Sequence, residues 1–305
     1  MPHHLLFPLF SSICFVFGMM FARSAIVKGT SPWTGTFFGN LWLAMIWSIY
    51  GISTGELLPA AGWWQAAAVG LTFFLGQLLT YLAFQYGDVS VATPIFGVKV
   101  IIVALLAAWL ANEPVPINVW IAALLATAGV AFVQAGTGHA KQGDSQPTIA
   151  GISQTAVLTT LLALLAALSL SLFDVGLQTW GRHWKSHRFL PVMFFSTGVF
   201  SCGVLPWVDR PRRLRELRTG RLMLTATLLM ALQAMSMSYS LAAFGDATRI
   251  NIVYALRGIW AVVLAWMLSR FFGSREANLS SRVMLLRLFG AALLVVSVFA
   301  ALVRF

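Results

Sequence analysis

Two stretches of sequence decide the fold: residues 86–99, YGDVSVATPIFGVK, and residues 244–257, FGDATRINIVYALR. Each contains a Gly-Asp pair that is followed eleven residues later by a cation, Lys99 in the first stretch and Arg257 in the second. Both cations lie near the middle of apolar runs. A charge at bilayer depth costs about 2.5–3.5 kcal/mol on insertion scales, so it is rarely placed there without a use. The pair predicts a duplicated membrane protein with basic groups from both halves at one central site.

The composition agrees with a membrane protein. Apolar residues make up 59% of the 305 positions and charged residues 10%, and a chain folded in water could not cover so much apolar surface. The formal net charge is +11. Because the basic residues lie in short segments between apolar runs, without an RNA-binding motif, we expect contact with anionic lipid headgroups and not with nucleic acid.

The chain offers no convincing metal or cofactor site. Cys14 and Cys202 both lie in apolar runs, so they indicate neither a disulfide framework nor a thiolate metal site. His183 and His187 lie four residues apart, but the basic residues around them disfavour a metal cation. We therefore expect no metal and no cofactor.

Ten segments are long enough to cross a bilayer. A helix needs about 20 residues to span roughly 30 Å of hydrocarbon. The apolar runs of this length lie near residues 5–27, 32–54, 63–86, 90–111, 115–136, 153–180, 189–208, 220–243, 247–270 and 283–304. The first run lacks a preceding basic segment and is followed by others, so we interpret it as a transmembrane helix and not as a cleaved signal.

A polar stretch almost at the centre of the chain, residues 136–147 (GTGHAKQGDSQP), predicts a flexible linker. We divide the chain into a first five-helix repeat at 1–136, a linker at 137–152 and a second repeat at 153–305. Because each repeat has an odd number of spans, the second is inverted in the membrane relative to the first. The predicted fold class is an all-α integral membrane protein with two inverted five-helix repeats, as in many secondary transporters.

The first half also resembles a known family. The stretch 86–99, followed by an apolar helix, the segment Asn112-Glu113-Pro114 and another apolar helix, resembles an EamA-type repeat of the drug/metabolite transporter superfamily. The second half repeats the pattern more loosely, because Ile252 replaces the proline and a clear Gly-Glu is missing. The resemblance implies ten spans in a bacterial inner (plasma) membrane. It also implies alternating-access transport of amino acids, nucleotide sugars, sugar phosphates or other metabolites.

Lys99 and Arg257 are the first candidates for substrate binding. In a low-dielectric cavity, two cations attract a carboxylate or phosphate more strongly than in water. The resemblance favours this interpretation, because the sugar-phosphate translocators, distant members of the superfamily, use basic residues on corresponding helices. The alternative is structural: each cation pairs with an acid or with carbonyl groups, or extends toward the interface.

Asp174 is the only acid well inside a predicted span, on a helix face that also carries Ser171 and Gln178. It could carry a proton and couple transport to a proton gradient. It could equally be a fixed counter-ion to Arg257 or Lys99. We favour the counter-ion, because a partnered aspartate holds its charge and is a poor proton carrier.

Other polar residues are weaker candidates for substrate binding. Gln77 and Tyr81 lie one turn apart on the third predicted span, Tyr239 lies on the eighth and Asn251 on the ninth. Hydrogen bonds between helices explain these residues equally well. Pro94 predicts a kink in the fourth span that frees a carbonyl group. The polar stripe beside Tyr239 consists of Gln233, Ser236 and Ser240.

Two arguments about membrane orientation disagree. Ten spans place both termini on one side, and the resemblance implies the cytoplasmic side. The positive-inside rule favours the opposite side, because thirteen Lys and Arg residues fall on loops after odd-numbered spans and five on the other side.

These features together predict a secondary transporter for a small polar metabolite bearing a carboxylate or phosphate. The sequence has no P-loop, so transport would run on a substrate or ion gradient. The alternative is a membrane-embedded enzyme acting on a lipid-linked substrate; without a His-Glu-x-x-His motif, we expect no enzyme. Gly35 and Gly39 form a GxxxG pattern that indicates helix packing, with a homodimer as the alternative.

Overall fold

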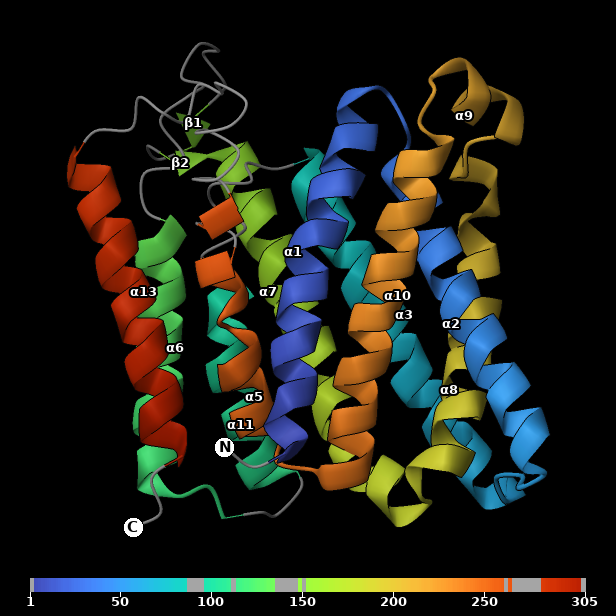
Figure 1. Cartoon of the computed structure of the whole chain (residues 1–305), viewed down its shortest axis with the longest axis horizontal. Helices are drawn as coiled ribbons and strands as arrows, with labels where there is room; N and C mark the ends of the chain where they lie inside the picture. The colour runs from blue at the N-terminus through green and yellow to red at the C-terminus, as the bar shows by residue number, and fades with distance from the viewer. Residues whose placement is uncertain are drawn as a thin grey trace.

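The computed structural model describes residues 3–86, 96–110, 114–134, 148–149, 152–260, 263–264 and 281–302, and most of these residues are helical (Figure 1). The α-helices are α1 (Leu6–Val27), α2 (Pro32–Thr54), α3 (Ala60–Tyr86), α5 (Lys99–Trp109), α6 (Ile117–Gln134), α7 (Gln154–Gly176), α8 (Ser186–Ser201), α9 (Pro211–Glu216), α10 (Gly220–Phe244), α11 (Ala247–Tyr254) and α13 (Ser281–Leu302). The prediction of an all-helical architecture is confirmed.

Short elements flank these helices. They are the 3-10 turns η1 (His3–Leu5), η2 (Phe96–Val98) and η4 (Cys202–Trp207), the π-helical turn η3 (Leu177–Gly181), and the strands β1 (Thr148–Ile149) and β2 (Ile152–Ser153). The two strands form a small antiparallel hairpin in which Thr148 lies opposite Ser153. This hairpin lies at the end of the predicted linker (137–152), and its last residue, Ser153, is the first residue of the predicted second repeat.

Six helices of the described part are long and apolar enough to cross a membrane. They cover Leu6–Val27, Ala60–Ala83, Val157–Gly181, Ser186–Trp207, Gly220–Phe244 and Leu285–Leu302. Lys99–Trp109 and Ile117–Val133 form shorter apolar helices. The predicted spans at 90–111 and 247–270 extend in part beyond the described residues.

Helix α7 shows why this sequence suits a bilayer. Ala163, Ala166 and Ala167 are fully buried against neighbouring helices, whereas Leu161 and Leu165 on the outer face are about half exposed. Water would penalise the exposed leucines. In a membrane, large apolar side chains face lipid, and small residues allow helix backbones to approach closely. The distribution of large and small residues is therefore that of a lipid-facing helix.

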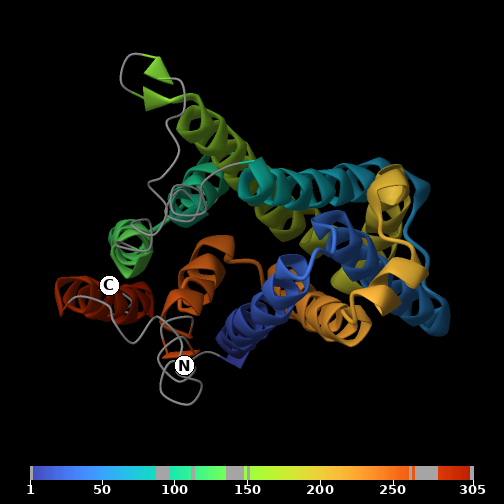
Figure 2. The ribbon, with the colours of Figure 1, turned by 90° about the horizontal axis from the view of Figure 1, so that it is seen from above.

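Helices from before and after the central polar stretch pack against one another. The closest pairs are α1 with α10, α2 with α8, α3 with α7, and α6 with α13. Figure 2 shows α6 (green) and α13 (red) at one side of the molecule. These two helices touch at glycines, since a Cβ atom added to Gly290 would lie 2.7 Å from the carbonyl oxygen of Gly129.

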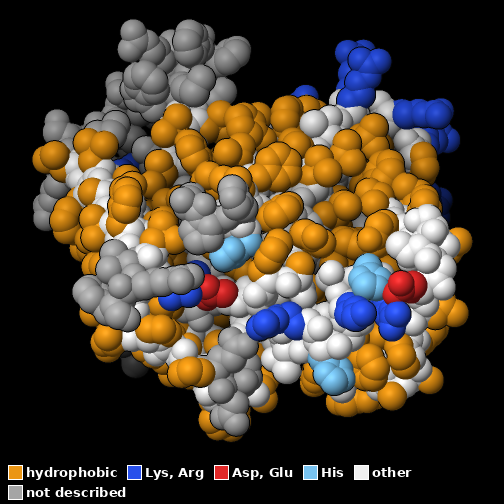
Figure 3. All heavy atoms as spheres, turned by 60° about the horizontal axis from the view of Figure 1, so that its bottom comes forward, with side chains coloured by type: hydrophobic (Ala, Val, Ile, Leu, Met, Phe, Trp, Pro, Cys, Tyr) orange, Lys and Arg blue, Asp and Glu red, His pale blue; other side chains and the backbone are white. Residues whose placement is uncertain are grey.

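The two ends of the helix bundle differ. Helix α1 begins and α13 ends at the lower end in Figure 1, whereas α9 lies at the upper end. Asp209, just before α9, accepts hydrogen bonds from the backbone N–H of Ser31 and from Thr34 Oγ1, and so holds the α9 segment to the start of α2. In Figure 3 the lower end is turned forward, and charged and histidine side chains gather on it below the apolar flank.

Candidate functional site: a charged cluster between the halves

Both candidate cations follow directly on a short segment that is not regular α-helix. Lys99 is the first residue of α5 and comes after the 3-10 turn η2. Arg257 comes after a turn at residues 255–256, where α11 has ended and before helical residues resume at 257–260. Interrupted helices inside a membrane protein expose backbone groups and mark substrate or ion sites in many transporters. Each cation therefore begins a helical segment that follows a turn, and the equivalence of the two positions stays a prediction.

Helix α11 is fixed at its start by Asp246. This residue adopts the left-handed conformation (φ 59°) and caps the helix by accepting a hydrogen bond from the backbone N–H of Arg249. Arg249 in turn pairs with Asp246 through Nη1 at 3.0 Å and donates from Nε to the carbonyl of Ala301 at 2.8 Å. These contacts tie α11 to the end of α13 and set the positions of Asn251 and Tyr254.

Lys99, Asp174 and Asn251 form the charged centre of the site. Lys99 Nζ lies 2.7 Å from Asp174 Oδ2, and Asn251 Nδ2 donates to the same oxygen at 2.7 Å. Asp174 is only 1% exposed and Asn251 only 2%. The three residues come from α5, α7 and α11, so the cluster joins helices from both sides of the central polar stretch. Asp174 is therefore an ion-paired and hydrogen-bonded carboxylate.

Gln178, in the π-helical turn η3 that continues α7, supports this arrangement. Its Oε1 accepts a hydrogen bond from the backbone N–H of Ala247 at 2.7 Å, the first residue of α11. Asn251 Nδ2 also donates to the carbonyl of Ala247, at 2.9 Å. The polar face that the sequence indicated, which runs from α7 into η3, thus holds α11 in place.

Arg257 lies in a different environment from Lys99. Its guanidinium carbon is 4.5 Å from the ring centroid of Tyr254 and 5.0 Å from that of Phe15 on α1. Within the described parts of the chain, no carboxylate lies within 4 Å of its nitrogens. Arg257 nevertheless follows shortly after α11, which packs against α5 and carries Asn251, the hydrogen-bond partner of Asp174. The structure therefore places Arg257 beside the Lys99–Asp174 pair, and among the described residues it pairs Lys99 but not Arg257 with an acid.

The remaining candidates do not join this cluster. The Tyr81 hydroxyl faces α2, where it would lie 3.7 Å from a Cβ atom added to Gly35. Tyr239 packs edge-on against Phe7 and Phe244. Gln77 is partly buried on α3, and Pro94 lies outside the described residues. The substrate-binding role of these residues remains a prediction.

The polar stripe on α10 has partners in the first helix. Gln233 donates to Ser11 Oγ at 3.2 Å, Ser236 to the carbonyl of Phe7 at 2.9 Å, and Ser240 to the carbonyl of His4 at 3.2 Å. These are hydrogen bonds between helices, which was the structural alternative for such a stripe.

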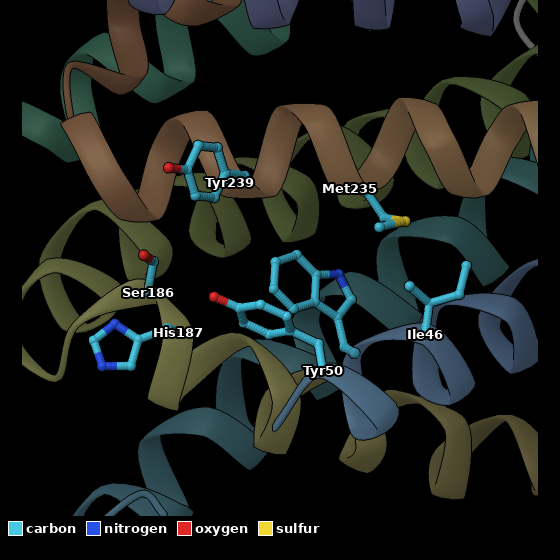
Figure 4. Close-up of a pocket in the computed structure, with 7 residues that line it drawn as sticks. Ile46, Tyr50, Ser186, His187, Met235 and Tyr239 are labelled. Carbon is cyan, nitrogen blue, oxygen red and sulfur yellow. The ribbon is translucent and has the colours of Figure 1, made fainter. Parts of the chain in front are cut away.

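Tyr239 instead lines a separate pocket of about 230 Å³ near the lower end of the bundle (Figure 4). The pocket lies between α2, α8 and α10 and is mainly aromatic and apolar. Its lining residues are Ile46, Trp47, Tyr50, Ser186, His187, Met235 and Tyr239. Trp47 and Tyr50 were not predicted as site residues, although the two are three residues apart on one face of α2. None of the charged-cluster residues lines this pocket.

One motif near this pocket bears on the enzyme alternative. Residues 51–55, GISTG, match Gly-x-Ser-x-Gly, a pattern that the sequence analysis overlooked. That motif is catalytic where the serine sits on a turn between a strand and a helix. Here Ser53 lies in the last turn of α2 and donates to the carbonyl of Tyr50 at 2.7 Å. The nearby His187 contacts Glu56, and the described hydrogen bonds of the chain include none between His187 and a serine.

Glu56, in the loop between α2 and α3, has a pKa below its ordinary value. Its carboxylate accepts hydrogen bonds from His187 and Arg188, each at 2.7 Å, and the Arg188 charge adds to the effect. A lowered pKa in the folded state means that the contact stabilises the fold above the unfolded pKa of about 4.5 and is lost as the pH falls through the folded value.

We therefore expect Glu56→Gln to melt at a lower temperature than the wild type at pH 7. The two melting temperatures should converge as the pH falls below about 4, because protonation removes the same charge from the wild type. Thermal unfolding of both proteins in detergent between pH 3 and pH 7 measures this. A difference that is constant over the whole range would contradict the assignment.

The fold and the cluster define a polytopic α-helical membrane protein with a buried charged site. Residues 4–134 match the EamA-like transporter family, so this part of the chain is similar to a family of the drug/metabolite transporter superfamily. The resemblance stated from the sequence is confirmed. A solved structure titled "Crystal structure of protein" shares the fold with a TM-score of 0.64 at 17% identity, covering 98% of this chain and 96% of that one. Comparison with curated proteins gave no match.

Proposed function

We propose that this protein is a secondary transporter that moves a small metabolite bearing a negative group, by alternating access between two inverted repeats. The family match over residues 4–134 supports membrane transport. The single observation that carries the anionic substrate is Arg257, a cation near Lys99 with no carboxylate partner among the described residues. A cation held in low dielectric without a counter-ion attracts an anion strongly.

Helix packing supports the inverted repeats. Under an exchange of α1 with α7, α2 with α8, α3 with α10, α5 with α11, and α6 with α13, the pairs α2–α8 and α6–α13 map onto themselves and other packing pairs map onto one another. The pair α1–α10 becomes α7–α3, α3–α8 becomes α10–α2, and α5–α7 becomes α11–α1, and all six pairs occur. A two-fold axis in the membrane plane would produce this pattern. Transporters with such symmetry place the substrate between the repeats near the midplane.

The surroundings of Arg257 suit a planar anion. Aromatic rings of Phe15 and Tyr254 lie close to the guanidinium group, and cation–π contact holds it in a fixed orientation. A fixed guanidinium offers a pair of N–H donors along its edge, which fits two oxygens of a carboxylate or phosphate. Binding from one side of the membrane and release to the other would complete a transport cycle.

The test uses purified protein reconstituted in liposomes. Carboxylates and phosphates are first screened for a rise in melting temperature, because a ligand stabilises the state that it binds. Compounds that raise it are then loaded into the liposomes, and exchange with external labelled compound is measured. Each acid is compared with its neutral amide. The proposal predicts exchange of acids and not of amides. Equal stabilisation by the amides, or no exchange of any acid, would overturn it.

A further inference from the structure

We infer that Asp174 sets the charge of the substrate, so that the site selects a monocarboxylate over a dianion. The inference rests on the proposed function and names its substrate class. The described ionic groups of the site are Lys99, Asp174 and Arg257. Lys99 and Asp174 cancel each other at 2.7 Å, so Arg257 supplies the single uncompensated positive charge.

The position of Asp174 makes this cancellation permanent. Its carboxylate is 1% exposed, and Oδ2 accepts from both Lys99 and Asn251. Asn251 is itself held by its second hydrogen bond to Ala247. A substrate anion could displace Asp174 from Lys99 only by leaving the aspartate buried without a counter-ion, which is strongly unfavourable. Lys99 is therefore occupied, and the substrate anion binds Arg257.

The net charge of the three ionic groups should then determine whether a monoanion or a dianion binds more tightly. A monoanion at Arg257 neutralises the site, whereas a dianion leaves one buried negative charge near Asp174 without a cation. Uncompensated like charges in a buried interface are costly. We expect the monoanion to bind roughly tenfold to a hundredfold more tightly than a dianion of the same shape. The planar, two-oxygen geometry at Arg257 favours a carboxylate as the anion.

The experiment compares glutaramate with glutarate, which have nearly the same shape and differ by one charge. Their binding is measured as displacement of a bound labelled acid and as a melting-temperature shift. The wild type should prefer glutaramate. In Asp174→Asn, the side chain keeps its shape and Lys99 regains an uncompensated charge, so the preference should move toward glutarate by roughly tenfold or more. A double variant, Lys99→Gln with Asp174→Asn, again has one net positive charge and should return to preferring glutaramate.

Glu56→Gln is the matched control, because it also removes one acid but at the end of the bundle. The ratio of its affinities for glutaramate and glutarate should equal that of the wild type. If the wild type binds glutarate as tightly as glutaramate, or if Asp174→Asn leaves the ratio unchanged, the inference on charge selection is wrong while anion transport stands. If Asp174→Asn does not fold, the glutaramate-to-glutarate affinity ratio of the wild type and of the double variant still tests the inference, because both proteins should prefer glutaramate. If the wild type binds no anion, the proposed function itself has failed.

Discussion

Arg257→Gln loses anion binding while the protein still folds. The substitution removes the one uncompensated cation of the described site and its paired N–H donors. Truncating a charged partner in a desolvated contact costs about 2–5 kcal/mol, which is roughly thirtyfold to several thousandfold in Kd. The effect on stability should be smaller, because the contacts with Phe15 and Tyr254 contribute only about 0.5–2 kcal/mol.

Arg257→Lys separates charge from geometry. Lysine keeps the positive charge, but it cannot donate a parallel pair of hydrogen bonds to a carboxylate and stacks less well on rings. We expect binding intermediate between the wild type and Arg257→Gln. Arg212→Gln is the control, because the Arg212 side chain is 91% exposed and pairs with Glu216, outside the buried charged cluster. The measurements are the carboxylate-induced melting-temperature shift and exchange in liposomes. Unchanged anion exchange by Arg257→Gln would show that the substrate binds elsewhere.

Much of the site follows from the spacing of residues along the chain. The equal offset of Lys99 and Arg257 from a Gly-Asp pair indicated equivalent positions, and the structure places Lys99 directly after a 3-10 turn and Arg257 directly after the turn at 255–256. Helical periodicity also put Asp174 and Gln178 on one face, and both side chains contact α11 residues. These features are local, since they depend on positions within one helix.

The pairing of residues between helices could not be predicted in the same way. Helical periodicity places Asp174 on one face of its helix but does not predict which cation pairs with it. In the structure that cation is Lys99. It likewise did not show that Arg257 meets Phe15 of α1. The stripe on α10 illustrates the same point, because its serines face the carbonyl groups of Phe7 and His4. The rotation and depth of each helix come from packing against its neighbours.

The buried ion pair between Lys99 and Asp174 should contribute strongly to the stability of the protein. Lys99→Met leaves Asp174 buried, with the Asn251 amide as its one remaining side-chain partner among the described residues. Removing one member of a buried ion pair destabilises a protein by about 3–5 kcal/mol, because the other charge remains uncompensated. We therefore expect Lys99→Met to unfold at a much lower temperature or denaturant concentration in detergent, even though methionine is tolerated well in apolar surroundings.

A double-mutant cycle isolates the pair from the general effect of each substitution. Replacing both residues, Lys99→Met with Asp174→Leu, removes both buried charges, and exchanging a buried ion pair for apolar residues is often neutral or stabilising. We expect the double variant to recover most of the stability that Lys99→Met loses. The exposed pair Arg212–Glu216, with Nε and Oε1 at 3.0 Å, provides the control cycle, and its coupling should be about 0.3–0.5 kcal/mol. A Lys99–Asp174 coupling as small as that of the exposed pair would mean that Asp174 does not hold Lys99. In that case Lys99 would be free to bind substrate together with Arg257.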